Sequence, residues 1–342
     1  MPAPLRPLAN PPNPWATTAV EYLDGEAPSA GLEVYEDQTR GILAKNDSPD
    51  VGFNWSVNPY RGCFHGCAYC YARPSHEYLS FGAGTDFERK IVVKKRAPQL
   101  LREAFDDEAW AGELVMFSGV TDCYQPLEAS YRLTRGCLEV CAEYGNPVAV
   151  ITKAPLVERD IDVLLDLGRS SRATVMVSIP FCDEAKARAI EPFVTPPARR
   201  LRTIERLAAA GVDVGVMVAP IIPGLNDEDI GPVLHAAREA GARRAGRVLL
   251  RLPGAVKHVF EERLRASLPL RADRVLRRIR ETRGGKLYDS RFGTRGSGEG
   301  PYADAIASLF DQTAQKLGYD PHEPIAPAPA TFRRPRGQLT LF

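Results

Sequence analysis

Short apolar runs alternate with amphipathic stretches through most of the chain. The runs are rich in β-branched residues and span Phe53–Val57, Leu114–Phe117, Val148–Thr152, Thr174–Ile179, Val214–Pro220 and Val248–Leu252. Between them, apolar positions recur with the helical period over residues 97–106, 127–144, 157–168, 198–210, 228–240 and 257–267. Continuous apolar runs between helices are typical of parallel strands that are buried on both faces. Six such units predict an α/β fold, a partial (β/α)6 TIM-like barrel rather than a closed eight-fold one.

The regions outside this barrel core have other patterns. KIVVKK at residues 90–95 predicts one additional short strand, and helices are expected at 273–283 and 302–317, around a glycine-rich loop. The predicted order is an irregular Pro-rich and acidic segment over 1–50, the barrel core over 51–255, a basic helical extension over 256–319 and a Pro-rich tail over 320–342. Such a tail is expected to be extended or disordered.

Composition narrows the class of protein. The 342 residues are 44% apolar and 25% charged, with a net charge of +1, as in ordinary globular proteins. No apolar run approaches the roughly 18 residues that a membrane span needs. The first residues lack the basic start and apolar centre of a signal peptide. We therefore expect a cytoplasmic protein that has no membrane partner.

Basic side chains gather toward the C-terminus. Between Arg263 and Arg295 there are eleven Lys or Arg residues against three acids, and three more arginines lie between residues 333 and 336. A local basic surface is typical of a protein with a polyanionic partner such as DNA. The alternative is a solvated helix face whose charges form ion pairs.

Three of the seven cysteines are closely spaced. The segment NPYRGCFHGCAYCYARPSHEYL (58–79) follows the first predicted strand and contains Cys63, Cys67 and Cys70 with the spacing C-x3-C-x2-C. Thiolates suit iron–sulfur clusters, and three of them leave one iron of a [4Fe–4S] cluster open to a further ligand. Loops after barrel strands lie at the C-terminal face, where active sites form. A zinc site completed by His65 or His76 is the alternative.

This motif resembles that of the radical S-adenosylmethionine (SAM) superfamily. The flanking sequences RGCFHGCAYCYARPSHEYL and SGVTDCYQPLE are similar to those of its spore photoproduct lyase-related branch. The resemblance implies that the three cysteines hold a [4Fe–4S] cluster whose open iron binds SAM. One electron then cleaves SAM to methionine and a 5′-deoxyadenosyl radical. An electron donor such as flavodoxin or ferredoxin is implied as a partner.

The same resemblance suggests further SAM contacts. Tyr69 occupies the position that lies against adenine in this superfamily. The stretch after the second core strand stands where relatives bind the SAM amino group, and it contains Ser118, Gly119, Thr121 and Asp122. The alternatives are simple packing for Tyr69 and a capped turn for this stretch, with Asp122 bonded to the backbone.

Two later positions complete the expected cofactor site. Ser178 ends the fourth core strand and should face the mouth of the barrel, as should Lys153. Arg199 resembles the arginine that approaches the SAM carboxylate, and Arg200 and Arg202 compete for this role.

Cys123 is a candidate catalytic residue. The lyase-related branch uses a cysteine in this region as a hydrogen-atom donor, but here the cysteine follows the Thr-Asp pair. A buried, unreactive thiol is the alternative. Cys137 and Cys141 are four residues apart on a predicted helix and are expected in the core.

The chain ends in GQLTLF. Gln338, Leu339, Leu341 and Phe342 resemble the motif by which bacterial DNA polymerases and repair proteins bind the sliding clamp. A tail that folds back onto the domain is the alternative. The expected function is thus a radical SAM enzyme that acts on DNA, in repair or base modification. The other hypotheses are a radical SAM enzyme for RNA, peptide or a small molecule, and a non-enzymatic iron–sulfur adaptor on the clamp.

Overall fold

A curved sheet forms the centre of the molecule. The computed structural model describes residues 31–319 and 330–335. Within these residues the sheet has six parallel strands in the order β10-β9-β8-β7-β6-β3, and β2 pairs antiparallel with β3 at one edge. The strands are β2 (Leu43–Lys45), β3 (Trp55–Val57), β6 (Val115–Phe117), β7 (Val148–Thr152), β8 (Ala173–Ser178), β9 (Asp213–Ile221) and β10 (Arg244–Leu249). The predicted α/β class with a parallel sheet is confirmed.

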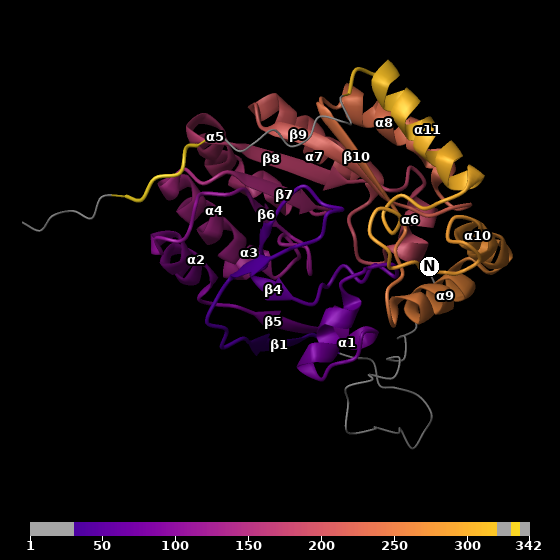
Figure 1. Cartoon of the computed structure of the whole chain (residues 1–342), viewed down its shortest axis with the longest axis horizontal. Helices are drawn as coiled ribbons and strands as arrows, with labels where there is room; N and C mark the ends of the chain where they lie inside the picture. Colours follow the sequence, from indigo (N-terminus) through magenta and orange to yellow (C-terminus); the bar gives the residue numbers. More distant parts are fainter. Residues whose placement is uncertain (1–30, 320–329, 336–342) are drawn as a thin grey trace, which may run out of the picture.

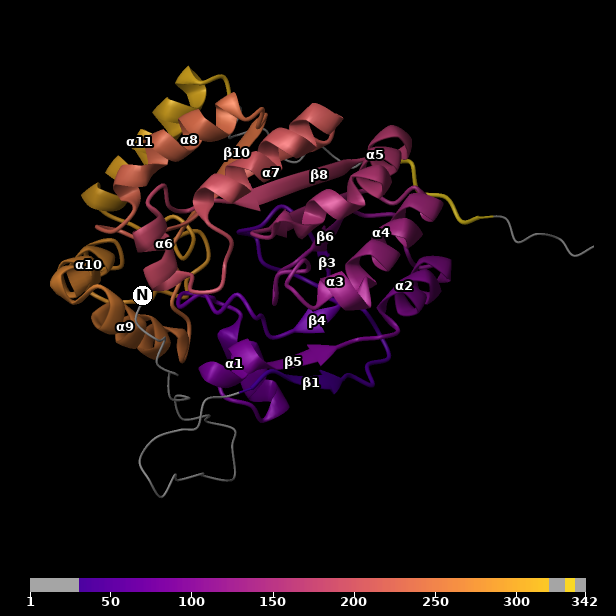
Figure 2. The same cartoon turned by 180° about the vertical axis from the view of Figure 1, so that it is seen from behind.

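Helices connect the strands and cover the outside of the sheet (Figures 1 and 2). They are α2 (Ala97–Asp106), α3 (Glu128–Tyr131), α4 (Leu133–Tyr144), α5 (Ile161–Ser170), α6 (Glu184–Ile190), α7 (Pro197–Ala210) and α8 (Ile230–Glu239), with 3₁₀ turns η1 (Arg73–Leu79), η2 (Pro155–Asp160) and η3 (Asp227–Asp229). Leu138 of α4, Leu164 of α5 and Leu207 of α7 are at most 1% exposed and share one hydrophobic cluster with strand residues such as Val150 and Val216. Burial of each such side chain stabilises the fold by about 1.5–3 kcal/mol.

A smaller sheet lies beside the cysteine segment. β1 (Glu33–Glu36) pairs parallel with β5 (Lys90–Val93), which pairs antiparallel with β4 (Tyr60–Arg61), and α1 (Thr85–Arg89) precedes β5. The strand predicted in KIVVKK is therefore confirmed as β5. The prediction of an irregular segment over 1–50 is wrong at its described end, where β1 and β2 form. All four residues of β1 are exposed, so no buried face marks this strand in the sequence.

The helix predicted over 127–144 is broken in two. Arg132 has a left-handed φ of 53° between α3 and α4. The Glu128 carboxylate accepts hydrogen bonds from the backbone N–H groups of Thr134 (3.0 Å) and Arg135 (3.2 Å). It thereby satisfies donors at the start of α4 that no helical carbonyl can reach. The apolar period runs across the break, and so the pattern alone does not reveal it.

The last strand of the main sheet begins at Arg244 rather than at the predicted Val248. β10 is an edge strand, and Arg244 and Arg247 interrupt the apolar run that marks the inner strands. The Arg247 guanidinium lies 5.6 Å from the ring centroid of Phe310, on helix α11 (Pro301–Lys316). An aromatic side chain from a later helix thus covers an arginine within the strand.

The C-terminal extension packs onto the barrel near the cysteine segment. It consists of α9 (Val256–Ser267), α10 (Pro269–Glu281) and α11. The inner face of α10, with Val275 and Ile279, shares a hydrophobic cluster with Cys67 and Tyr69. In the described residues, no helix is both long enough and apolar enough to cross a membrane.

Part of the tail is bound to the barrel. Phe332 stacks on Tyr144 with 6.0 Å between ring centroids and meets Phe105 edge-on at 5.8 Å. The Arg334 guanidinium donates to the backbone carbonyls of Phe105 (3.0 Å), Asp107 (2.6 Å) and Trp110 (3.1 Å). Residues 331–334 therefore form an anchor, which we call the tail anchor. Arg334 is among the basic residues expected to meet a polyanionic partner, but its guanidinium binds carbonyls of the protein itself.

Candidate functional site

The three cysteines of the motif lie on one loop at the C-terminal end of β3. Cys63 and Cys67 are 6% and 8% exposed, and all three thiols are free. Burial raises the pKa of Cys67 well above its ordinary value, and the neighbouring Cys70 and Cys63 raise it further. Burial and Cys63 together raise the pKa of Cys70 to about 11. Cys63 and Cys70 also share one small side-chain cluster, and three neighbouring thiols on one loop are a donor set that fits an iron–sulfur centre.

Both histidines of the zinc alternative have partners of their own. His76 Nε2 donates to the Lys90 carbonyl at 2.8 Å, and His65 Nδ1 lies 3.4 Å from the Asp122 carboxylate. Among the described residues, no three His, Cys, Asp or Glu side chains are placed to hold a single metal ion. His65 also acts on the neighbouring Cys63. Burial alone would raise the pKa of the Cys63 thiol, but His65 lowers it.

Arg73, which sequence reasoning missed, binds the cysteine loop through backbone carbonyls. Its fully buried guanidinium donates to the carbonyls of Gly66, Cys67, Ala83 and Gly84 at 2.9–3.1 Å. It also pairs with Glu88 at 2.5 Å, and Arg263 approaches the same carboxylate oxygen at 3.2 Å. Because backbone carbonyls are its main partners, a sequence motif could not have identified it. Its place three residues after Cys70 was the only signal.

Thr121 also supports the loop, and its predicted SAM contact stays a prediction. Its hydroxyl donates to the Gly62 carbonyl at 2.6 Å. Gln125 donates to the same carbonyl at 3.1 Å and accepts from the Phe64 N–H at 3.1 Å. The structure therefore gives Thr121 a bond to the cysteine loop. Gln125 is a second supporting residue that the sequence analysis did not name.

Asp122 connects the cysteine loop to β7. Its carboxylate accepts from the Thr152 hydroxyl at 2.7 Å, from the Lys153 N–H at 2.8 Å and from the Tyr124 N–H at 2.9 Å. Although burial opposes it, these bonds and His65 lower the pKa of Asp122 to about 2. The observed contacts match the turn-capping alternative, and the predicted SAM role of Asp122 stays a prediction.

Ser118 and Cys123 face the protein, whereas Gly119 lines a cavity. The Ser118 hydroxyl donates to the Ile151 carbonyl at 2.6 Å and accepts from the Cys123 N–H at 3.3 Å. Cys123 is fully buried in the main hydrophobic cluster, and this burial raises the pKa of its thiol well above the usual range. A role as hydrogen-atom donor stays a prediction, and in this structure its thiol is closed off. Cys137 and Cys141 lie in the same cluster, as expected.

Tyr69, Ser178 and Arg200 form a second connected group. The Tyr69 hydroxyl donates to Glu191, and the buried Arg200 donates to Glu191 at 2.5 Å and to the Ser178 carbonyl at 2.8 Å. The Lys153 ammonium lies 5.7 Å from the centroid of the Tyr69 ring. Tyr69 and Ser178, which were predicted from different parts of the chain, are thus brought together at the C-terminal end of the strands.

Arg199 points elsewhere. Its guanidinium pairs with Glu158 at 2.5 Å and donates to Thr203 at 2.9 Å. Glu158 also binds the exposed Arg206, which places this cluster at the outer face of α7. Arg200, the competing candidate, is the arginine that reaches Tyr69 and Ser178.

A cavity of about 710 Å³ opens beside the cysteine loop. Tyr71, which follows Cys70, and Val120 contribute to its wall, and Val120 also packs in the small cluster around Cys63 and Cys70. Gly119 lines the cavity as well. The cavity and the cysteine loop therefore share a wall.

Comparison with known proteins is consistent with this geometry. The family model of the radical SAM superfamily matches residues 57–237. This range covers more than half of the chain and includes the three cysteines, so the chain belongs to the radical SAM superfamily. It is an enzyme of the radical SAM class, whose cofactors are a [4Fe–4S] cluster and SAM.

Similar sequences and similar folds come from different proteins. An uncharacterized protein of Mycobacterium tuberculosis is 37% identical over 233 residues, which cover 67% of this chain and 68% of that protein. One from Methanocaldococcus jannaschii is 30% identical over 182 residues, 53% of this chain and 66% of the relative. Spore photoproduct lyase complexed with dinucleoside spore photoproduct has a similar fold, with a TM-score of 0.57 and 16% identity over 84% of this chain and 80% of the lyase.

Proposed function

We propose that this enzyme acts on DNA, in repair or base modification, with the cluster held by Cys63, Cys67 and Cys70. When bound, the cluster supplies the electron that cleaves SAM to methionine and a 5′-deoxyadenosyl radical. Arg73 and Thr121 fix the cysteine loop, and Tyr69, Ser178 and Arg200 form the wall against which SAM is proposed to lie. The similarity to a lyase solved with a dinucleoside ligand supports a nucleic acid substrate.

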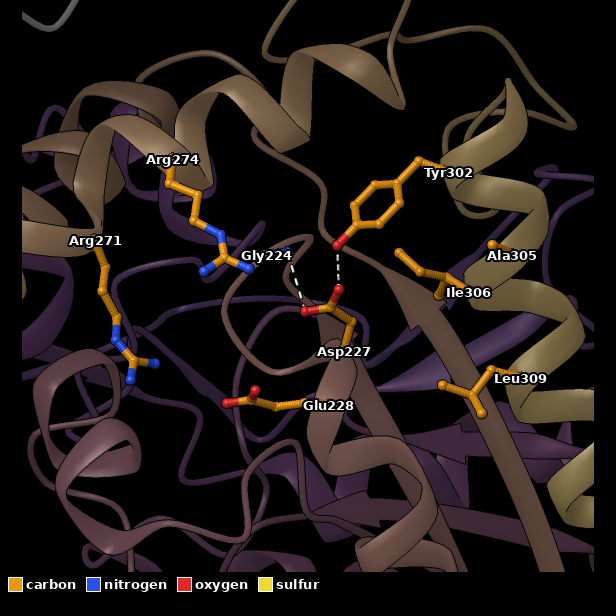
Figure 3. Close-up of a pocket in the computed structure, with 9 residues that line it drawn as sticks. All are labelled: Gly224, Asp227, Glu228, Arg271, Arg274, Tyr302, Ala305, Ile306 and Leu309. Carbon is orange, nitrogen blue, oxygen red and sulfur yellow. Dashed lines mark hydrogen bonds between the residues drawn. The ribbon is translucent and has the colours of Figure 1, made fainter.

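The observation that carries the choice of DNA is the outer face of α10. Of the eleven basic residues between Arg263 and Arg295, six have internal partners: Arg263, Arg265, Arg278, Arg283, Arg291 and Arg295. The other five are exposed, namely Arg271, Arg274, Arg277 and Arg280 on α10 and Lys286 just beyond it. No described carboxylate lies within ion-pairing distance of the four α10 arginines. Figure 3 shows Arg271 and Arg274 extending from the helix above a pocket, opposite Tyr302.

The position of α10 relates these arginines to the site. Its inner face packs in the cluster that contains Cys67 and Tyr69. In the pocket of Figure 3, Asp227 accepts from the Gly224 N–H at 3.0 Å and from Tyr302, and Glu228 pairs with Lys186 at 2.9 Å. The acids of this pocket therefore have partners of their own. Arg271 and Arg274 act on Glu228 through charge alone, so the arginine face of α10 remains available to contact phosphates.

The cluster assignment is tested by anaerobic reconstitution. The intact chain should bind about four irons and form 5′-deoxyadenosine when reduced with SAM. Cys63→Ala, Cys67→Ala and Cys70→Ala should each abolish SAM cleavage, whereas the exposed Cys182→Ala is the matched control and should retain it. Cleavage that survives removal of any motif cysteine would contradict the assignment. A spectrum that does not change when SAM is added would favour the adaptor hypothesis instead.

The DNA assignment is tested by the salt dependence of binding. The slope of log K against log salt is negative for a protein that neutralises phosphates. Arg271→Gln combined with Arg274→Gln and Arg277→Gln should make this slope less negative by roughly 0.9 for each phosphate that is no longer neutralised. Arg188→Gln, which removes an exposed charge paired with Glu184 on α6, should leave the slope unchanged. If DNA does not bind at low salt, while SAM cleavage persists, the substrate is RNA, peptide or a small molecule.

Two partners complete the proposal. Gln338, Leu339, Leu341 and Phe342 lie outside the described residues, and we propose on their sequence alone that they bind the sliding clamp. An electron donor such as flavodoxin or ferredoxin is proposed as the source of the cluster's electron. The clamp proposal gains a point of attachment from the tail anchor, which ends just before this motif.

A further inference from the structure

The cavity beside the cysteine loop carries polar groups that the protein leaves without partners. Ser75 Oγ and Arg251 Nε are buried atoms with no hydrogen-bond partner in the described residues, and both residues line the cavity. Buried polar atoms are nearly always bonded, and an exception calls for an explanation such as an absent ligand. Two such atoms on one cavity indicate a site that is completed by another molecule.

The charge of the cavity lining indicates that this molecule is an anion. Five basic residues line the cavity, Lys45, Arg61, Lys94, Arg251 and Arg295, against the single acid Asp47. Arg61 pairs with Asp37 and Arg295 with Asp50. No described carboxylate lies within 4 Å of the Lys94 or Arg251 cations.

Lys94 is a buried cation in the wall of this cavity. It is only 8% exposed, and burial together with Arg61 lowers its pKa to about 8, although Asp37, which pairs with Arg61, opposes this shift. A buried cation without a close counter-ion is unfavourable, and an entering anion relieves this penalty. SAM has two cationic groups, its sulfonium and its ammonium, against one carboxylate, so its net positive charge makes it a poor occupant of this part of the site.

The aromatic side chains of the lining indicate the rest of the ligand. Tyr71 is 49% exposed, Tyr78 77% and Phe292 59%. The Arg251 guanidinium lies 5.4 Å from the Tyr71 ring centroid. Exposed rings next to cations are the groups that stack bases and bind phosphates in single-stranded nucleic acids. A cavity of about 710 Å³ also lies in the size range of small-ligand sites.

We infer that this cavity receives one extruded or single-stranded nucleotide, with its phosphate bound by Lys94 and Arg251 and its base stacked on Tyr71 or Tyr78. The inference rests on the proposed DNA function and locates the substrate within it. The nucleotide would then lie across the shared wall from the cysteine loop. Extrusion is required because both faces of a base within a duplex are covered by its neighbours, so that it cannot stack on Tyr71 or Tyr78.

The test uses the full chain with its cluster and three fluorescent single-stranded tetranucleotides. One is natural, one lacks its second base and one has a neutral methylphosphonate at the central linkage. Lys94→Met and Arg251→Met should weaken binding of the natural probe by about tenfold or more, with little effect on the methylphosphonate probe. Tyr78→Ala should weaken the natural probe by about tenfold and leave the abasic probe unchanged.

Matched controls are available outside the cavity. Lys95→Met removes the neighbouring charge, which pairs with Glu36 outside the cavity, and Tyr131→Ala removes an exposed ring elsewhere; neither should change binding. Arg251→Lys should keep most of the binding if a cation is what matters, and equal melting temperatures exclude misfolding. Equal weakening for the neutral and natural probes, no weakening at all, or weaker SAM binding in the Lys94 variant would each overturn the inference.

Failure of the inference can be told apart from failure of the proposed function. If the wild-type chain binds none of the three probes at low salt while it still forms 5′-deoxyadenosine, the DNA function itself is wrong. If the wild type binds the natural probe but the cavity variants bind it equally well, only the location of the nucleotide is wrong.

Discussion

Arg73 is the residue on which the shape of the cysteine loop most depends. Its guanidinium satisfies four backbone carbonyls and the buried Glu88. Arg73→Met leaves these acceptors unpaired, so we expect the free energy of unfolding to fall by about 3–5 kcal/mol and fewer irons per chain after reconstitution. Urea unfolding and iron analysis measure the two effects. Arg199→Met, which removes an arginine from a partly exposed ion pair, is the control and should keep its iron.

Gly62 is required by its surroundings as well as by its backbone. It has a φ of +77°, and a Cβ there would lie 2.8 Å from His76 Cε1 and 2.9 Å from the Phe87 carbonyl oxygen. Gly285 has a similar φ of +86°, but a Cβ there would meet nothing within 4 Å. Gly285→Ala should therefore cost about 1–2 kcal/mol from the backbone alone, and Gly62→Ala clearly more. Thermal unfolding compares them, and equal destabilisation would contradict the predicted clash.

Whether a residue's role can be proposed from the sequence depends on the kind of partner that the residue binds. The cysteines and Tyr69 could be proposed from the sequence because side chains at a fixed spacing mark them, and their roles stay predictions. Thr121, Ser118 and Arg73 bind backbone carbonyls, and such bonds leave no trace in the order of residue types. The choice between Arg199 and Arg200 depended on which face of the helix turns toward β8. Consecutive residues on a helix point about 100° apart, so a shift of one residue changes the face on which an arginine lies.

At the scale of elements, the strands buried on both faces were the most predictable. β7 and α2 have the predicted bounds, because their patterns depend only on burial by their immediate neighbours. The break between α3 and α4 depends on a side-chain bond from Glu128 to the nearby Thr134 N–H, which hydrophobic periodicity does not report. The edge strand β10 depends on a tertiary partner, Phe310 on α11. β1 depends on backbone pairing with β5. These long-range causes are absent from a local pattern.

The tail anchor could not be predicted from the Pro-rich composition of the tail. Phe332 lies against the rings of Tyr144 and Phe105, whereas Arg333 contributes only its backbone N–H, bonded to the Tyr144 carbonyl at 2.8 Å. Phe332→Ala should lower the free energy of unfolding by about 1–2 kcal/mol, and Arg333→Ala should leave it unchanged. Guanidinium unfolding curves of the two variants make the comparison. If both have wild-type stability, the anchor does not hold in solution.

At the scale of the whole molecule, the site and the tail anchor lie at opposite ends of the strands. The cysteine loop, Lys153 and Ser178 follow β3, β7 and β8, whereas the anchor bonds to Gly145 (2.8 Å) and Ser171, which precede β7 and β8. In a parallel sheet these are the two opposite edges. A partner held just beyond the anchor would therefore approach the molecule from the face away from the substrate.

This arrangement leads to a prediction for the proposed clamp partner. Leu341→Ala with Phe342→Ala should weaken capture of the full chain by immobilised sliding clamp by at least about tenfold, because the two apolar anchors of the motif are removed. Thr340→Ala changes the variable position between them and is the matched control. Formation of 5′-deoxyadenosine should be the same with and without clamp, since the two ends of the barrel are separate. Equally weak capture of the Thr340 variant would contradict recognition of the motif, and suppression of SAM cleavage by the clamp would contradict the two-ended arrangement.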